Sequence, residues 1–367
     1  VSLGGSALWQ RHTLTRPMSQ PAAKKPKVVG NGAAASQDVQ VVYAGMPGCF
    51  SEKAAKQYFN IKLKDEKYAT SGLRSVATVF QAVQDGVAQF GVVPVENSYS
   101  GSLHQVFDHL LEFEHLQIVG EIGCLEEHCL LSLQTVSDKS MLRAVRGHPH
   151  ILDACSRYLE ALEKANDSEI RCEPAMNSAS ACKDLTSTPS IEPTAVIAPF
   201  EAAEIYDLRV LERGIANDKN AETRYIILGR AMRAEAAPAA GLAPGGSATE
   251  IPMFKSSIVL ALSNVEGSVF KIIAQFSTRN INILKVETRP AATANSRQPV
   301  LSTSPRHWDY LFYIDFEPSR SPQTNKNLIS ALSEFSMWMR DLGTYQAHSN
   351  GLVVSRPDWS ILDTASC

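Results

Sequence analysis

The sequence lacks several features that would place the chain in a specialised class. Its seven cysteines are odd in number and include no C-x-x-C pair, which argues against a disulfide framework and favours a reducing interior. No apolar run reaches the roughly 18 residues that a membrane span needs. The net charge of −3 gives no global basic surface for nucleic acid. The nine histidines form no metal-binding signature, so no metal site is expected.

Acidic residues are also missing from the first 37 positions, where Arg11, Arg16 and three lysines lie among small residues and proline. This composition suits an organelle transit segment. A disordered extension is the alternative. We therefore expect residues 1–38 to be a tail outside the folded part of the chain.

The remaining chain is long enough for two or three domains, and its hydrophobic content of 44% is ordinary for a globular protein. Residues 231–250 are rich in Ala, Pro and Gly, which is typical of a linker. We predict one domain over 39–230, a second over 251–350, and a C-terminal tail over 351–367.

Short apolar runs alternate with helical patterns in the first domain, which favours α/β layers with mainly parallel strand pairing. The predicted helices cover 51–58, 151–162 and 200–206. The predicted strands cover 39–44, 90–95, 116–124, 129–133, 195–198 and 225–228.

The second domain shows the order strand, helix, strand, strand, helix, strand, which is the ferredoxin-like plan. The first helix presents a buried stripe from Val269 to Phe276, and the second a stripe from Leu328 to Met339. Two helices on one face of the sheet leave the other face free to pair with a second subunit. Residues 291–307 form a polar loop inserted between two strands.

Four polar segments of the first domain lie at strand ends, where open α/β sheets bind ligands. They are 45–52, 94–102, 147–150 and 222–225. In the last of these, Arg224 beside a hydroxyl suits bidentate recognition of a carboxylate. None of the four is a G-x-G-x-x-G fingerprint, so a dinucleotide-dependent enzyme is a weak alternative.

These segments, in this order, resemble the prephenate and arogenate dehydratases. The resemblance rests on Tyr43-Ala44-Gly45 through Glu52, Val93 through Ser98 with Gly101, Gly147-His148-Pro149, and Thr223-Arg224-Tyr225. It continues beyond the linker, where Glu287-Thr288-Arg289-Pro290 is similar to an element of the family's phenylalanine-binding ACT domain. The likeness spans about Val39 to Tyr345.

The resemblance implies a bilobal dehydratase domain, similar to type II periplasmic binding proteins, that binds its substrate between the lobes. It implies that Thr223 helps the ring hydroxyl to leave, that Asn97, Ser98 and Ser51 orient the substrate, and that Arg224 pairs with a carboxylate. Glu96 belongs to the same catalytic set. Further substrate-binding residues implied by the motifs are Gly101, His148 and Ser178. No cofactor is implied.

The resemblance also implies that L-phenylalanine binds the ACT domain as an effector and that subunits associate through this domain as a homodimer or homotetramer. The implied effector-binding residues are Gly267, Ser268, Val269, Asn282, Glu287, Thr288, Arg289 and Pro290.

Several positions depart from the family pattern, and three of them, Gly147, His150 and Ala154, lie in the second-lobe part of the proposed substrate site. They motivate the alternative of a weak or inactive phenylalanine-sensing protein on the same scaffold. Prephenate and arogenate are not separated by these motifs. The linker and the 291–307 insertion look like the plant-type arogenate enzymes, which implies the plastid stroma if the tail is a transit segment and the cytoplasm otherwise.

Overall fold

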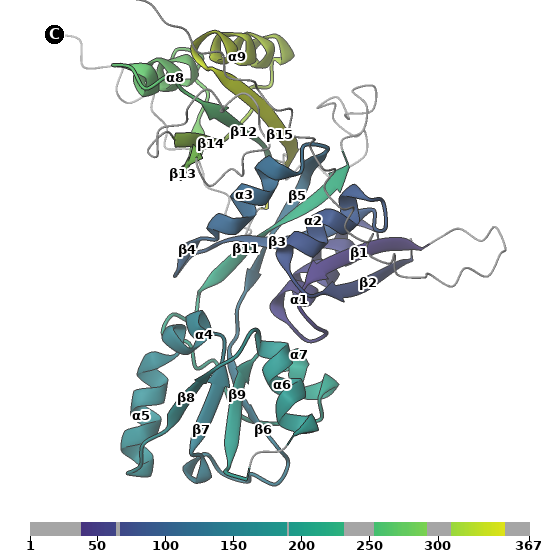
Figure 1. Cartoon of the computed structure of the whole chain (residues 1–367), viewed down its shortest axis with the longest axis vertical. Coiled ribbons are helices and arrows are strands. Elements are labelled where there is room, and N and C mark those ends of the chain that lie inside the picture. Colours follow the sequence, from purple (N-terminus) through teal and green to yellow (C-terminus); the bar gives the residue numbers. More distant parts are fainter. Residues whose placement is uncertain (1–37, 64–66, 189–190, 231–252, 292–309, 349–367) are drawn as a thin grey trace, which may run out of the picture. The chain divides into compact units, whose positions relative to one another are not determined.

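The computed structural model describes residues 38–63, 67–188, 191–230, 253–291 and 310–348, which form three β-sheets flanked by helices (Figure 1). The mixed α/β class predicted from the sequence is confirmed. The predictions for the tail 1–38, the linker 231–250, the insertion 291–307 and the C-terminal tail 351–367 fall, apart from Asp38 and Ala291, outside the described residues.

The first lobe is built on a sheet of order β2-β1-β3-β11-β5, with the short β4 paired to β3. Apolar side chains of both sheet faces are buried, one face against α1 and the other against α2 and α3. Its elements are β1 (Val39–Ala44), α1 (Phe50–Lys62), β2 (Tyr68–Leu73), α2 (Val76–Gln84), β3 (Phe90–Asn97), β4 (Gly101–Ser102), α3 (His104–Glu112), β5 (Leu116–Leu125) and β11 (Glu222–Arg230).

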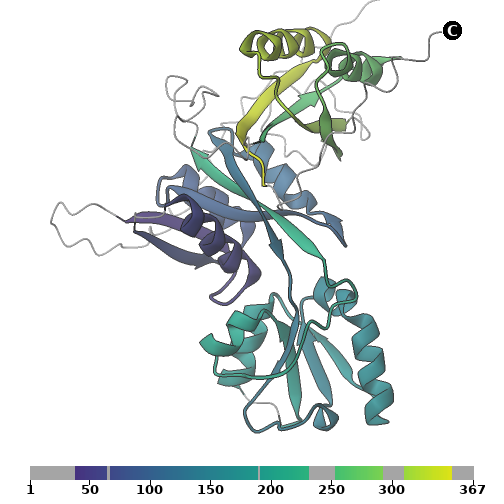
Figure 2. The same cartoon turned by 180° about the vertical axis from the view of Figure 1, so that it is seen from behind.

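The second lobe is built on a sheet of order β10-β6-β9-β7-β8, with α5 on one side and α6 and α7 on the other (Figures 1 and 2). Its elements are β6 (Cys129–Ser132), η1 (Lys139–Met141), β7 (Ala144–Gly147), α4 (Pro149–Ala154), α5 (Ser156–Asn166), β8 (Arg171–Pro174), α6 (Ser178–Ser187), β9 (Thr194–Ala198), α7 (Phe200–Ile205) and β10 (Arg209–Arg213).

The expectation of mainly parallel pairing is wrong, because each lobe mixes the two kinds. Strand β1 is parallel to β2 and β3, and β7 is parallel to β8 and β9. Strand β11 is antiparallel to both β3 and β5. The reason is the path of the chain, which leaves the first lobe after β5 and returns in β11 from the opposite direction.

Two chain segments cross between the lobes, namely residues 126–128 after β5 and residues 214–221 before β11. The two crossings are hydrogen-bonded to each other. The Glu126 amide donates to the Ala221 carbonyl at 3.1 Å, and the Ile215 amide donates to the His128 carbonyl at 3.1 Å. Together they form a two-stranded connection that ends directly at the start of β11.

The single helix predicted over 151–162 is instead two helices, α4 and α5, that meet at Cys155. Asn217 of the second crossing holds this break. Its amide N–H donates to the Ala154 carbonyl at 2.7 Å, and its side-chain oxygen accepts from the Arg157 amide at 3.1 Å. A side chain inserted at a helix end in this way satisfies backbone groups that a continuous helix would pair internally.

The C-terminal sheet has the antiparallel order β13-β14-β12-β15, and α8 and α9 cover one of its faces (Figure 1). Its elements are β12 (Phe254–Ala261), α8 (Ser268–Ser277), β13 (Ile283–Pro290), β14 (Tyr310–Phe316), α9 (Pro322–Phe335) and β15 (Trp338–Gln346). The element order is strand, helix, strand, strand, helix, strand. Ile272 and Phe276 of the first predicted stripe and Leu328 and Leu332 of the second lie in the core beneath these helices. The rest of the stripes differs from the prediction, because Val269 and Ile273 are exposed and Met339 belongs to β15.

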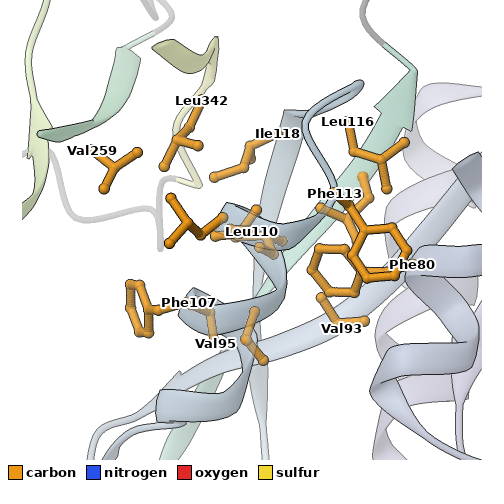
Figure 3. Packing of buried hydrophobic residues seen from close by; sticks show 14 of the residues in the cluster. Phe80, Val93, Val95, Phe107, Leu110, Phe113, Leu116, Ile118, Val259 and Leu342 are labelled. Atoms are coloured by element: carbon orange, nitrogen blue, oxygen red, sulfur yellow. The ribbon is translucent and has the colours of Figure 1, made fainter. Parts of the chain in front are cut away.

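The other face of the C-terminal sheet is not free for a second subunit, so that expectation is wrong. Val259 and Leu342 of this sheet share one buried cluster with Phe107 and Leu110 of α3 and with Ile118 of β5 (Figure 3). The apolar side chains of this face are therefore withdrawn from water by the first lobe of the same chain.

The six cysteines that the structure describes are all free thiols, and five of them are buried. Among the described residues, no helix has the length and apolar character of a membrane span.

Gly343 offers a test of the contact between β15 and the first lobe. A Cβ atom at this position would lie 2.3 Å from the Ile118 carbonyl oxygen, whereas one at Gly214 would meet nothing within 4 Å. Both glycines have positive φ, which strains any residue with a side chain. We expect Gly343→Ala to lose a further 1–3 kcal/mol of unfolding free energy through overpacking. Equal losses for Gly343→Ala and Gly214→Ala in chemical denaturation would contradict the contact.

Candidate active site

Asn97 and Thr223 lie opposite each other where β3 ends and β11 begins. The Asn97 side-chain amide Nδ2 donates a hydrogen bond of 2.8 Å to Thr223 Oγ1. The Thr223 side chain is almost fully buried. Two of the catalytic residues predicted from separate parts of the sequence are therefore in direct contact.

The orientation of the Asn97 amide is fixed by the turn that follows it. Asn97 Oδ1 accepts hydrogen bonds from the backbone amides of Tyr99 at 2.9 Å and Ser100 at 3.0 Å. Asparagine side chains commonly stabilise turns in this way. Because the oxygen is occupied by the turn, the NH₂ group must point toward Thr223.

Ser98 and Gly101 build the same turn. The Ser98 amide donates to the Glu222 carbonyl at 2.9 Å, and Ser98 Oγ accepts from the Glu222 amide at 3.0 Å. Gly101 has a φ of +83°, which favours glycine. These contacts bind the end of β3 to the residue that precedes Thr223.

Glu126 is the third member of the group and is absent from the residues predicted from the sequence. Thr223 Oγ1 lies 2.7 Å from Glu126 Oε1, and Asn97 Nδ2 lies 3.4 Å from Glu126 Oε2. Burial raises the pKa of Glu126 above its ordinary value, and this outweighs the hydrogen bond from Thr223 and the positive charge of Lys53. The Glu126 carboxyl group therefore keeps its proton to a higher pH than an ordinary glutamate does.

A signal for Glu126 is present in the sequence. Glu126, Glu127 and His128 are three polar residues between two apolar strands, at the point where the chain crosses between the lobes. Acidic residues at such a position face either the solvent or a binding site between the lobes. The structure distinguishes the two glutamates. Glu127 is exposed and pairs with Arg213 at 2.7 Å, whereas Glu126 turns inward toward Thr223.

His128 lies beside Glu126 but supplies no positive charge to it. The His128 Nε2 atom is 3.7 Å from Glu126 Oε2, and the ring packs edge-on against Phe50. Burial lowers the pKa of His128 to about 4, so the ring is neutral near neutral pH. Cys124, the cross-strand neighbour of Thr223, is also neutral, since burial raises the pKa of its thiol to about 12.

Ser51 and Tyr225 lie on the same side of the sheet as Thr223. Tyr225 is two residues from Thr223 along β11 and packs with Cys49 and Phe50 at the start of α1. Burial holds the pKa of Tyr225 well above its ordinary value, and a hydrogen bond with Ser51 opposes this. The first turn of α1 is thus anchored next to the Thr223 group.

The second lobe brings Ser178 and His148 toward this region through their helices. Ser178 is the buried first residue of α6, and the following Ala179 packs in the cluster that contains Tyr225. His148 caps α4, and its ring stacks on His150. The hydrogen bonds found among the described residues do not join His148 or Ser178 to Thr223.

Arg224 and Glu96 lie on the opposite face of the sheet from Thr223 and Asn97, because side chains alternate along a strand. The Arg224 guanidinium is 2.9 Å from Glu96, 3.1 Å from Glu121 and 3.2 Å from Asp315. Its attraction to these carboxylates outweighs burial and raises the pKa of Arg224. The structure therefore gives Arg224 carboxylate partners within its own chain, one of them in the C-terminal sheet.

Lys255 and Lys285 of the C-terminal sheet complete this network. Lys255 Nζ is 2.8 Å from Glu121, and Lys285 Nζ is 2.7 Å from Glu96. Burial would raise the pKa of Glu121, but the charges of Lys255 and Arg224 outweigh it and lower that pKa below its ordinary value. Three cations and three carboxylates thus join the first lobe to the C-terminal sheet.

The residues predicted to bind an effector separate into two groups on the structure. Glu287 lies 3.5 Å from His104, and Arg289 pairs with Asp108 at 2.8 Å, so both face the first lobe. Thr288 between them is exposed on the other side. Gly267 begins α8 with a φ of +76°, and a Cβ there would meet nothing within 4 Å. The Asn282 carbonyl accepts from the Glu317 amide.

Comparison with known proteins identifies relatives over most of the chain. The family described as prephenate dehydratase matches residues 41–233. The chain is 33% identical over 343 residues to arogenate dehydratase/prephenate dehydratase 6, chloroplastic, of Arabidopsis thaliana, covering 91% of this chain and 74% of that protein. It is 34% identical to arogenate dehydratase 3, chloroplastic, of the same plant, covering 88% of this chain and 71% of that protein.

Solved structures share the fold at lower identity. The prephenate dehydratase of Arthrobacter aurescens in complex with L-Phe is 22% identical, with a TM-score of 0.67 over 84% of this chain and 90% of that chain. A structure described as GqqA, a novel type of quorum quenching acylase, is 24% identical, with a TM-score of 0.65 over 84% of this chain and 98% of that chain. At these identities the likeness concerns the fold alone.

The ion network predicts an acid-sensitive stability. The contribution of Glu121 is present above the ordinary glutamate pKa of about 4.3 and is lost as the pH falls through its lowered folded value. Glu121→Gln should lose about 3–5 kcal/mol of unfolding free energy at neutral pH, since it breaks a buried pair, and less in acid. Glu192→Gln removes an exposed partner of Arg171 and should change stability by under about 1 kcal/mol. Denaturation curves with a pH-independent loss for Glu121→Gln would contradict this account.

Proposed function

The chain belongs to the prephenate dehydratase family, and on that basis we propose that it removes water and carbon dioxide from prephenate to give phenylpyruvate, or from arogenate to give phenylalanine. The observation that carries this proposal is the hydrogen-bonded group of Asn97, Thr223 and Glu126, where the two crossings between the lobes reach the first sheet. The names of the Arabidopsis relatives contain both activities. The catalytic domain is proposed to cover residues 39–230.

The step that needs catalysis is cleavage of the bond between the ring and its hydroxyl group. The substrate loses a carboxylate from one ring carbon and a hydroxyl from the opposite carbon, and the ring becomes aromatic, so the overall step runs downhill. The hydroxyl is a poor leaving group unless it receives a proton or a strong hydrogen bond. A positioned donor accelerates such a step by about 10²–10⁴, or about 3–5 kcal/mol.

Thr223 is the proposed donor, and Asn97 holds its oxygen in place. Ser98, Ser51 and Gly101 are proposed to line the first-lobe side of the substrate site, and His148 and Ser178 the second-lobe side. Closure of the lobes would exclude water from these polar groups and strengthen their contacts.

Arg224 and Glu96 are proposed to act from the opposite face of the sheet. Their ion pair fixes β11 against β3 one residue away from Thr223 and Asn97. This arrangement favours a supporting role for Arg224 over direct binding of a substrate carboxylate, since Glu96, Glu121 and Asp315 already occupy the guanidinium.

Residues 251–350 are proposed to form an ACT domain that binds L-phenylalanine as an effector. Support comes from the βαββαβ order of the C-terminal sheet and from the open backbone at Gly267, next to Ser268 and Val269. Asn282 and Thr288 lie on exposed positions of the same sheet edge. The related Arthrobacter enzyme was solved in complex with L-Phe.

The effector segment also offers a route to the catalytic residues. Glu287, Arg289 and Pro290 follow Lys285 on β13, and Lys285 binds both Glu96 and Ser102. Glu96 precedes Asn97 in β3. A shift of β13 on effector binding would therefore be transmitted to the strand that holds Asn97, and the coupling would be reciprocal.

The proposed location is the plastid stroma. The names of the Arabidopsis relatives include the word chloroplastic, and the basic, acid-free composition of residues 1–37 agrees with a transit segment.

The central test compares turnover of prephenate and arogenate, with and without L-phenylalanine. We expect aromatic product from at least one substrate and a change of rate with the effector. Thr223→Val should lower kcat by about 10²–10⁴-fold, because it removes the hydroxyl and keeps the shape of the side chain. Thr223→Ser, which restores a hydroxyl, should recover a substantial part.

Two results would count against these proposals. Calorimetric binding of phenylalanine without turnover of either substrate would favour the non-catalytic sensing protein. A Thr223→Val variant with unchanged kcat and unchanged thermal stability would remove Thr223 from the mechanism.

Self-association is proposed to use the apolar surface that remains on the C-terminal domain. Phe270 is 74% exposed, and Val265, Val269 and Ile273 of the same segment are also exposed. An aromatic side chain with this exposure is typical of an interface.

Phe270→Asp should therefore weaken or abolish the oligomer in sedimentation experiments. Ile61→Asp changes an exposed apolar residue of α1 and should leave it intact, and equal effects would contradict the assignment.

A further inference from the structure

The Thr223 hydroxyl has one proton, and its direction depends on Glu126. Asn97 Nδ2 already donates a hydrogen bond of 2.8 Å to Thr223 Oγ1, and this bond uses one lone pair of the oxygen. Glu126 Oε1 is 2.7 Å away on another side. When Glu126 is ionised, it accepts only, and the Thr223 proton must point to it. When Glu126 is protonated, it donates to Thr223, and the Thr223 proton is released toward a ligand.

We propose that protonated Glu126 directs the Thr223 hydroxyl toward the departing hydroxyl group and replaces the proton that Thr223 delivers to it. Glu126 acts through Thr223 and is therefore a positioning residue of a proton relay. This inference rests on the proposed dehydratase reaction. It explains how a threonine, whose hydroxyl is a very weak acid, delivers a proton without becoming an alkoxide.

The bonds balance in a single concerted step. The bond between the ring and the departing carboxylate breaks, and its electron pair enters the ring. The opposite carbon–oxygen bond breaks, and that oxygen takes the Thr223 proton to leave as water. Thr223 takes the proton of Glu126, and the Glu126 carboxylate is reprotonated from solvent after carbon dioxide and water depart.

The groups that face Glu126 carry little net charge among them. Lys53 of α1 exerts an attraction on Glu126, but its ammonium is paired with Glu201 at 3.1 Å. His128, Cys124 and Tyr225 also surround the carboxyl group, and burial holds each of them in its uncharged form.

The geometry also predicts what an amide would do in place of the carboxyl group. Asn97 Nδ2 lies 3.4 Å from Oε2, so an introduced glutamine should place its oxygen there and its NH₂ group toward Thr223. Glu126→Gln therefore keeps the hydrogen bond to Thr223 but has no proton to pass on. Glu127→Gln is the matched control, since Glu127 is the exposed neighbour on the same crossing.

The experiment measures kcat against pH for the wild-type protein and both variants with the substrate that is turned over. Wild-type and Glu127→Gln activity should fall as the pH rises through the raised pKa of Glu126, because the relay loses its proton. Glu126→Gln should lose about 10²-fold or more of kcat, with little change in KM, and its residual rate should lack this alkaline decline. A wild-type rate in Glu126→Gln, or an unchanged alkaline decline, would overturn the relay.

Two further measurements separate failure of the relay from failure of the proposed reaction. The double variant Glu126→Gln with Thr223→Val should be no slower than Thr223→Val alone, and losses that multiply would overturn action through Thr223. Infrared titration of the ligand-free protein needs no turnover. The wild type should show a protonated carboxyl group that titrates above the ordinary glutamate pKa of about 4.3. This group should be missing in Glu126→Gln. Its absence from the wild type would overturn the relay even if neither substrate reacts. Lack of turnover with this group present would instead count against the proposed reaction, and with it the delivery step.

Discussion

The guanidinium of Arg224 joins carboxylates from β3, β5 and β14, and much of the structure depends on this ionic contact. Arg224 pairs with Glu96 and Glu121 of the first lobe and with Asp315 of the C-terminal sheet. Glu121 is nearly fully buried, so its desolvation is costly unless a cation lies beside it. The network therefore requires the C-terminal sheet to supply Lys255 and Asp315 at fixed positions.

The sequence predicts the order of the elements and groups Asn97 with Thr223 as catalytic residues, but it does not predict the faces on which residues lie. The resemblance places both Thr223 and Arg224 at the substrate, but adjacent residues of a strand point to opposite sides. The apolar run predicts a strand that begins at residue 225, whereas β11 begins at Glu222, so Thr223 and Arg224 lie outside the predicted strand and its alternation does not extend to them. Glu126 could not be separated from Glu127 without the hydrogen bonds between the two crossings. The sequence pattern does not reveal that this face of the C-terminal sheet is covered, because its apolar partners, Phe107 and Ile118, belong to a distant part of the sequence.

This alternation has a consequence for regulation. Each residue of the Asn97–Thr223 pair has a direct chain neighbour in the ion network, namely Glu96 and Arg224. The two faces of the sheet therefore share the same two peptide segments, one face carrying the proposed catalytic residues and the other contacting the C-terminal sheet. A displacement of Asp315 or Lys285 changes the forces on Arg224 or Glu96 without any contact with the substrate. This is a physical linkage between two sites through elements that both contact, and it requires no long pathway of side chains.

The position of Glu126 joins the chemistry to the motion of the lobes. Thr223 belongs to the first sheet, but Glu126 lies on the crossing, where its amide is bonded to Ala221 of the other crossing. Rotation of one lobe relative to the other must be absorbed by these crossings, because they are the covalent links between the lobes. A hydrogen bond of 2.7 Å between Thr223 and Glu126 is sensitive to shifts of a few tenths of an ångström. Closure around a substrate would therefore adjust the proton relay at the same moment that it excludes water, which ties proton delivery to the presence of the group that needs it.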